Sequence, residues 1–137
     1  MNTPLETKSN LQIIQNAFAD FMSGNIQSII DTCTEDIFWT GAENPGVRVS
    51  GTFNGKDEVV IFFKFLAEDV DYSIFEPKEF FSDKDVVVVV GHQTGKVKKT
   101  GKTFDHDWCM IFKLRDGKIY HYHIFVDTRD QGEAFKS

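Results

Sequence analysis

The sequence predicts an α+β domain in which helices come first and a curved antiparallel sheet follows. Apolar residues recur at helical spacing in the first half of the chain. From about Phe75 onward, β-branched and aromatic runs alternate with short groups of turn residues, which is typical of consecutive strands. The 137 residues, of which 41% are hydrophobic, suit one domain and leave no room for a second of ordinary size.

Two helices are predicted to open the domain. The first begins after Ser9 or Asn10, either of which can cap it, and ends at Gly24. A second, shorter helix follows Asn25, which is also a capping residue. Their apolar residues share one face in each helix: Leu11, Ile14, Phe18 and Phe21 in the first, and Ile26, Ile29, Ile30 and Cys33 in the second. Each helix therefore has a face to bury.

A short strand over residues 37–40 separates these helices from a third. Residues 41–55 are rich in Gly, Asn and Pro, so we expect a long connection there. The third helix begins near Lys56 with acidic residues in its first turn, where they favour the helix dipole. Its apolar residues repeat at helical spacing: Val59, Phe62, Phe63 and Leu66.

The strands of the sheet are divided by turn residues at positions 82–85, 99–101 and 115–117. The clearest alternation covers residues 104–114. One face of this strand carries Phe104, His106, Trp108, Met110, Phe112 and Leu114. The other face is mostly polar, so we expect the first to point into the core.

Two registers are open for the last hairpin. A three-residue turn over 115–117 sets His106 opposite Val126 and turns four residues inward: Tyr120, Tyr122, Ile124 and Val126. A two-residue turn slips the register by one, sets His106 opposite Asp127 and turns His121 and His123 inward. We favour the first register because its inner face is more apolar and does not bury two further histidines.

His106 is the sharpest candidate for chemistry. In the favoured register it is the one ionisable group on an aromatic inner face. A neutral imidazole there can act as a general base or form a hydrogen bond with a ligand. The alternative interpretation is a core histidine whose ring is satisfied by a hydroxyl or a carbonyl group.

The outer face of the same hairpin carries His121 and His123 near Cys109 and Asp107, a spacing that zinc or nickel ligands also show. Histidine pairs on strands are mostly solvent or interface residues, so we expect no metal and no cofactor. Three apolar residues share this face: Ile111, Ile119 and Phe125. It is too apolar to face water alone, and we expect a homodimer through the sheet.

Charge and composition exclude several classes of partner. The chain has 15 basic and 21 acidic residues and a net charge of −6, so it repels nucleic acid and anionic membranes. Its longest apolar runs are far shorter than the roughly 20 residues that cross a bilayer, and no charged-then-apolar leader opens it. Two cysteines cannot form a disulfide framework. We therefore expect a cytoplasmic protein.

Several segments, taken in order, carry a family resemblance. In the first half of the chain they are Asp-Ile-Phe-Trp at 36–39 and the stretch from Gly51 through Gly55-Lys56 into a helix that ends Phe-Phe-Lys-Phe-Leu at 62–66. In the second half they are Asp-Val-Val-Val at 85–88, Gly-Lys-Thr-Phe at 101–104, Asp-Gly-Lys-Ile at 116–119 and Val-Asp-Thr at 126–128. Over about residues 10–130 the chain resembles the SnoaL-like polyketide cyclase family. That family belongs to the nuclear transport factor 2-like superfamily, with ketosteroid isomerase and limonene epoxide hydrolase as relatives. Such diffuse motifs identify a fold better than an activity.

The resemblance implies a cone: a strongly curved antiparallel sheet that wraps a deep apolar pocket closed by three N-terminal helices. It implies a loose N-terminus over residues 1–9, a single SnoaL-like domain over 10–130 and a C-terminal tail over 131–137. By position, the pocket would be lined by Trp39, Phe63, His106, Trp108, Met110, Tyr122 and Ile124, with His92 and Gln93 as further candidates. The family is commonly dimeric through its sheet.

The chain departs from its relatives at the position of their catalytic carboxylate, because the last strand carries Ile124 there. Limonene epoxide hydrolase also needs an Arg and an Asp two positions apart, where this chain has Gly91-His92-Gln93. Asp127 falls off the inner face, which indicates a structural role. The sequence thus predicts a pocket for a small apolar or aromatic molecule, with isomerase, lyase or cyclase chemistry through His106, or else a non-catalytic binding or dimeric association domain.

Overall fold

The computed structural model describes residues 9–137, which fold into four helices and six strands. In chain order these are α1 (Asn10–Met22), α2 (Ile26–Asp31), β1 (Cys33–Gly41), β2 (Gly51–Asn54), α3 (Lys56–Asp69), β3 (Val70–Asp83), β4 (Val86–Val97), β5 (Thr103–Arg115), β6 (Lys118–Val126) and α4 (Thr128–Phe135). The loose terminus expected over residues 1–9 falls, apart from Ser9, outside the described residues.

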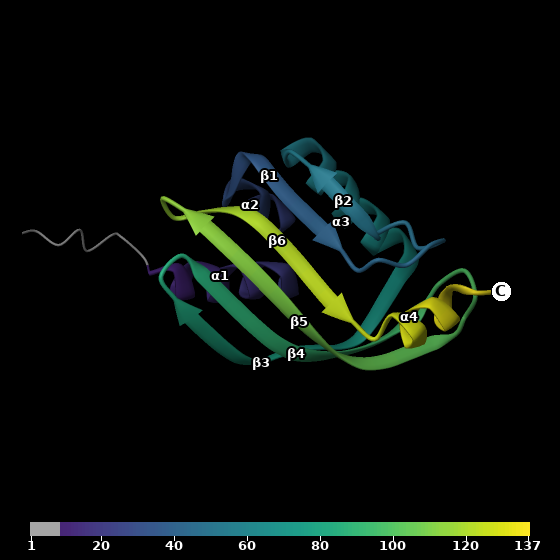
Figure 1. The fold of residues 1–137 in the computed structure, drawn as a ribbon. Helices are drawn as coiled ribbons and strands as arrows, with labels where there is room; N and C mark the ends of the chain where they lie inside the picture. Colours follow the sequence, from purple (N-terminus) through teal and green to yellow (C-terminus); the bar gives the residue numbers. More distant parts are fainter. Residues whose placement is uncertain (1–8) are drawn as a thin grey trace, which may run out of the picture.

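The strands form one curved, unclosed sheet in the order β2-β1-β6-β5-β4-β3. Neighbouring strands are antiparallel, except that β1 and β6 run parallel. Helices α1 to α3 lie behind the sheet in Figure 1, and α4 follows the end of β6. The predicted α+β class is confirmed, with one parallel pair and a fourth helix that the sequence patterns did not indicate.

The starts of α1 and α2 follow from capping side chains. The Ser9 hydroxyl accepts a hydrogen bond from the backbone N–H of Gln12 at the start of α1, and the Asn25 side chain does the same for Ser28 in α2. Both predicted caps are confirmed. Within residues 9–137, no helix combines the length and the apolar character needed to cross a membrane.

Two strand boundaries differ from the sequence prediction. The expected connection over 41–55 contains the short strand β2, which pairs with the end of β1. Strand β3 begins at Val70, ahead of the change of pattern near Phe75. In both places pairing with a neighbouring strand extends the sheet through residues whose own pattern is weak.

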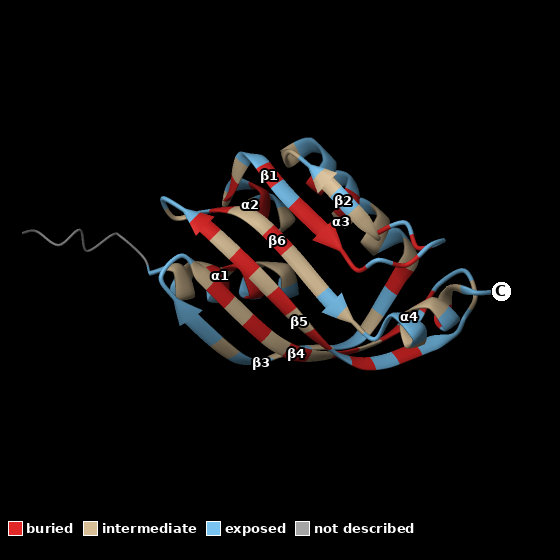
Figure 2. Cartoon of the chain, in the orientation of Figure 1, coloured by how far each residue is buried: buried red, intermediate tan, exposed pale blue. Residues whose placement is uncertain are grey.

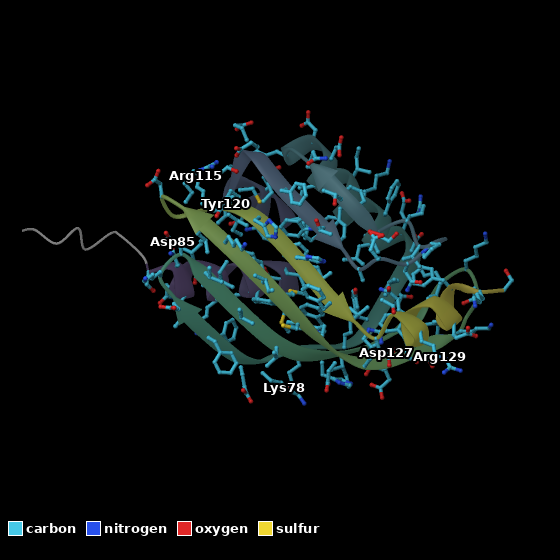
Figure 3. The ribbon with its side chains drawn as sticks, in the orientation of Figure 1. Lys78, Asp85, Arg115, Tyr120, Asp127 and Arg129 are labelled. Atoms are coloured by element: carbon cyan, nitrogen blue, oxygen red, sulfur yellow. The ribbon has the colours of Figure 1, made fainter. Side chains whose placement is uncertain are left out.

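The last hairpin adopts neither of the two registers. Asp116 and Gly117 both have positive φ and form a two-residue turn, which pairs Arg115 with Lys118. A bulge at Tyr120 then shifts the register again, so that Tyr122, Ile124 and Val126 face inward opposite Phe112, Met110 and Trp108. The bulge buries Ile119 fully and leaves Tyr120 outside, beneath the Arg115 guanidinium at the end of the hairpin (Figure 3). The predictions for these two residues, Tyr120 inward and Ile119 outward, were wrong.

The core lies between the inner face of the sheet and the helices. Along β5 buried residues alternate with exposed or half-buried ones, as Figure 2 shows, and the predicted inner face is confirmed. On β4 two inner positions are glycines, Gly91 and Gly95, and aromatic rings occupy the space beside them. A Cβ atom at Gly91 would lie 2.4 Å from the Trp108 ring, and one at Gly95 would lie 2.6 Å from the Phe104 ring. These glycines let large rings of β5 lie flat against β4.

Candidate ligand cavity and the His106 cluster

An apolar cavity of about 90 Å³ lies between the helices and the inner face of the sheet. Helix α1 contributes Phe18 and Phe21 to its wall, and α3 contributes Phe62 and Phe63. Because the walls are mainly aromatic and aliphatic, the cavity suits a molecule with little polar surface.

The structure places five of the residues predicted for the pocket in this wall: Trp39, Phe63, Met110, Tyr122 and Ile124. His106 and Trp108 share the same inner face but are not among the lining residues. Trp108 is held in an aromatic stack, with its ring centroid 5.7 Å from Phe18 and 5.2 Å from Phe75. It therefore fills the core beside the cavity.

Four polar side chains reach the wall: Tyr72, Gln93, Tyr122 and Gln131. Burial raises the pKa of Tyr72, and burial together with the nearby Tyr72 raises the pKa of Tyr122. Both phenols consequently stay protonated at neutral pH. In the same wall, the indole Nε1 of Trp39 is buried and has no hydrogen-bond partner among residues 9–137. These donors are thus available to a ligand oxygen.

His106 lies behind Gln93, and both of its ring nitrogens have a partner. Nδ1 is 2.9 Å from the Asp130 carboxylate, and Nε2 is 2.8 Å from the side-chain nitrogen of Gln93. The ring also stacks on Phe104 at 5.3 Å, and only 3% of the side chain is exposed. A carboxylate and an amide thus satisfy this histidine, in place of the hydroxyl or carbonyl considered from the sequence.

Asp130 reaches His106 because the start of α4 holds it there. The Asp127 side chain caps this helix by accepting a hydrogen bond from the Asp130 backbone N–H at 3.0 Å. Burial acts to raise the pKa of the Asp130 carboxyl, but hydrogen bonds from His106 and from the Asp105 backbone N–H outweigh it and lower that pKa. Asp127 thus has a structural role, as the sequence indicated, because its side chain caps α4. The carboxylate that meets His106 is that of Asp130.

Sequence reasoning missed both partners of His106. Asp130 falls at the boundary of what was expected to be a tail, yet an acid three positions after Asp127 is a recognisable helix-start signal. Gln93 was named only through the family resemblance, and the structure places it in the wall of the cavity. His92, its neighbour, points the other way and contacts Asp105 and Asp107 on the outer face.

The outer-face histidines are arranged as aromatic pairs. His121 stacks on Phe38 at 5.5 Å, and His123 stacks on Phe125 at 4.2 Å. Among residues 9–137, no group of three or more His, Cys, Asp or Glu side chains gathers as a metal site would require.

A curved sheet with helices on its inner side and an apolar cavity between them defines a class of small α+β proteins with an internal cavity. The chain belongs to the SnoaL-like domain family, whose model matches residues 14–122. The family resemblance of the sequence is thereby confirmed.

Solved structures extend this comparison. An NTF2-like protein from Burkholderia xenovorans LB400 is 31% identical, with a TM-score of 0.83 over 93% of this chain and 95% of that one. An NTF2-like protein from Burkholderia thailandensis E264 is 26% identical, with a TM-score of 0.86 over 96% and 100%. TerC, co-crystallized with polyporic acid, is 25% identical, with a TM-score of 0.78 over 93% and 98%. No curated protein matches the chain in sequence.

Proposed function

We propose that this protein binds a small, largely apolar molecule that carries at least one oxygen atom. The observation that carries the proposal is the set of polar groups in the wall of an aromatic cavity: the buried indole N–H of Trp39, which has no hydrogen-bond partner among the described residues, and the phenols of the half-buried Tyr72 and the buried Tyr122. A buried polar group without a partner costs free energy, which a ligand oxygen would recover. The relative TerC was co-crystallized with polyporic acid, which supports a ligand-binding role. The cytoplasmic location expected from the sequence remains part of this proposal.

The two tryptophans provide a direct test. Trp39 lines the cavity and stacks on Tyr122 at 3.9 Å, whereas Trp108 lies outside the lining. Titration of the ¹⁵N-labelled protein with 4-methylphenol should shift the indole N–H signal of Trp39 in a saturable manner and leave that of Trp108 nearly unchanged.

The variant Tyr122→Phe keeps the ring and removes the hydroxyl, and we expect it to weaken 4-methylphenol binding about fivefold. Tyr120→Phe is the matched control, because Tyr120 lies outside the cavity under Arg115. Absence of a saturable shift, or equal affinities for the two variants, would refute the proposal.

Acid–base chemistry is a second candidate, favoured by the contact between His106 and Asp130. A carboxylate 2.9 Å from Nδ1 orients an imidazole as it does in enzymes that use histidine as a base. The substrate would be an apolar carbonyl compound. In the first step, Nε2 of His106 would take a proton from the carbon next to the carbonyl group and leave an enolate, which requires the Gln93 amide to turn away from that nitrogen. Hydrogen–deuterium exchange at that carbon in 4-phenyl-2-butanone, followed by NMR in D₂O, tests this. Exchange above the buffer rate that His106→Gln abolishes supports catalysis, and exchange at the buffer rate rejects it for this ketone.

We also propose that the outer face of the sheet joins two copies of the chain. Phe38 and Phe125 are 43% and 48% exposed there, beside the half-buried Cys109 and Ile111. Light scattering coupled to size-exclusion chromatography should give the mass of a dimer for the unmodified protein and of a monomer for Phe125→Glu. Val60→Glu, at an equally exposed position on helix α3, is the control and should remain dimeric. A monomeric unmodified protein contradicts this proposal.

A further inference from the structure

Gln93 lies on the inner face of β4, in a narrow space between two aromatic rings. The inner positions on either side of it, Gly91 and Gly95, have no side chain, and the rings of Trp108 and Phe104 fill that space. Gln93 is 3% exposed and lines the cavity. Its amide is therefore confined between two aromatic walls, with His106 directly across the strand pair.

The partners of His106 determine where its ring proton sits. The Asp130 carboxylate can only accept a hydrogen bond, so the facing Nδ1 atom must carry the proton. In the neutral ring Nε2 is then a lone-pair acceptor. The group that faces it at 2.8 Å must donate, and in Gln93 that group is the amide NH₂. Asp130 and His106 thus orient the Gln93 amide through one continuous set of hydrogen bonds.

This orientation leaves the carbonyl oxygen of Gln93 on the side away from the imidazole. The oxygen accepts no hydrogen bond from any residue that the structure describes, and the side chain lines the cavity. We infer that His106 is a positioning residue, which fixes the Gln93 amide so that its carbonyl oxygen faces the ligand, and that the cavity therefore selects molecules with a hydroxyl group. The inference rests on the binding function proposed above and specifies the ligand class, a phenol or an enol.

The selectivity follows from the chemistry of the groups in the wall. The Tyr72 and Tyr122 hydroxyls can donate to or accept from a ligand, whereas an amide oxygen can only accept. A ligand hydroxyl satisfies the Gln93 oxygen, but an ether or ketone oxygen leaves it without a donor. Burial makes such a missing partner costly.

Two probes of similar shape test the selectivity: 4-methylphenol, which has a hydroxyl donor, and 4-methylanisole, in which a methyl group replaces that proton. The unmodified protein should bind the phenol more tightly. In Gln93→Leu, and in His106→Phe, which preserves a ring beside Phe104, the ratio of the two dissociation constants should fall about three- to tenfold. His92→Gln, on the outer face of the same strand, should leave that ratio unchanged.

A second measurement needs no ligand. In ¹⁵N-histidine-labelled protein at neutral pH, the His106 ring should show the tautomer with the proton on Nδ1, assigned by its loss in His106→Phe. A proton on Nε2 would require the Gln93 oxygen to face the ring and would overturn the inference.

The outcomes separate the two claims. If both probes bind and Gln93→Leu keeps the ratio of the unmodified protein, the inference is wrong while the binding function stands. If neither probe produces a saturable shift, the binding function fails for this class of molecule and the inference fails with it. Loss of the preference in both variants, together with the Nδ1 tautomer, supports both.

Discussion

Two histidines lie on opposite faces of the same pair of strands, and their surroundings differ in an instructive way. His92 on β4 faces outward and contacts Asp105 and Asp107 at 2.6 and 2.7 Å. His106 on β5 faces inward and contacts Asp130 and Gln93 at 2.9 and 2.8 Å. About 23% of the His92 side chain is exposed, compared with 3% for His106. Each ring uses both of its nitrogens.

The partners, more than the burial, determine what each ring does. Two carboxylates both accept, so His92 is favoured as a cation, and hydrogen bonds to Asp107 and Asp105 raise its pKa. At His106 one partner is a carboxylate and the other is an amide, so the ring contacts one group that can only accept a hydrogen bond and one that can also donate. The outer histidine thus serves as a surface charge, and the inner one as a fixed hydrogen-bond relay.

The largest expected loss of stability comes from a change at His106, on the inner face of the sheet. His106→Ala leaves the Gln93 amide and the Asp130 carboxylate without their partner and opens a void beside Phe104. We expect it to lower the free energy of unfolding by about 3 kcal/mol. Urea denaturation followed by circular dichroism measures this, with His92→Ala as the comparison. A larger loss for the outer variant would reverse the contrast between the two faces.

A second test changes the packing beside Gln93, where the Trp108 ring fills the space next to Gly91. In Gly91→Ala the new Cβ atom would lie 2.4 Å from both the Trp108 ring and the Glu76 carbonyl oxygen. Because a backbone atom cannot give way cheaply, we expect a loss of about 2 kcal/mol in the free energy of unfolding. Thr94→Ala, on the outer face of the same strand, removes one hydrogen bond to Asp105 and should cost less. Equal losses at the two positions would show that the space beside Gln93 is not tightly packed.

A third test concerns the start of helix α4, which holds Asp130 against His106. Asp127→Ala removes the cap of α4, and a loss of about 1 kcal/mol is expected in the free energy of unfolding. Asp127→Asn retains a side-chain acceptor and should lose much less. Thermal unfolding of the three proteins checks this order, and an alanine variant as stable as the original would mean that α4 does not depend on its cap.

The smallest expected effect on stability comes from a change at His92, and this effect depends on pH. Its pKa in the folded protein lies above the ordinary value of 6.5, so its stabilising contribution is fully present below that pH. The contribution is lost as the pH rises through the raised pKa. The stability difference between the unmodified protein and His92→Gln should therefore shrink from pH 6 to pH 9 in urea titrations. A difference that grows with pH would contradict the ion pairs with Asp105 and Asp107.

The sequence predicts the elements of this fold well because most of them repeat a simple pattern. The alternation over residues 104–114 identifies the inner face of β5, and Ser9 and Asn25 mark two helix starts. The bulge at Tyr120 escapes such reasoning, because its benefit is the burial of Ile119, where the chain also forms a backbone hydrogen bond to Thr32. That contact exists only in the assembled structure.

The candidate site shows the same limit. The inner-face position of His106 follows from a local pattern, but its partners come from β4 and α4, which lie 13 and 24 positions away along the chain. Periodicity describes which face a residue occupies and says nothing of which other element lies across from it. The distinction between a base open to substrate and a relay behind Gln93 depends on those distant partners.

The parallel pairing of β1 with β6 has a consequence for how the chain reaches this structure. Trp39 on the first strand pairs with Tyr122 on the last, so neither β1 nor β2 can join the sheet before β6 exists. Contacts between such distant segments must overcome a large loss of chain entropy before they become favourable, and they slow folding. During synthesis the early helices and β1 would expose apolar surface until β6 has formed, and such a state favours aggregation. Strand β6 thus completes the cavity and also ends the period in which the chain is prone to aggregate.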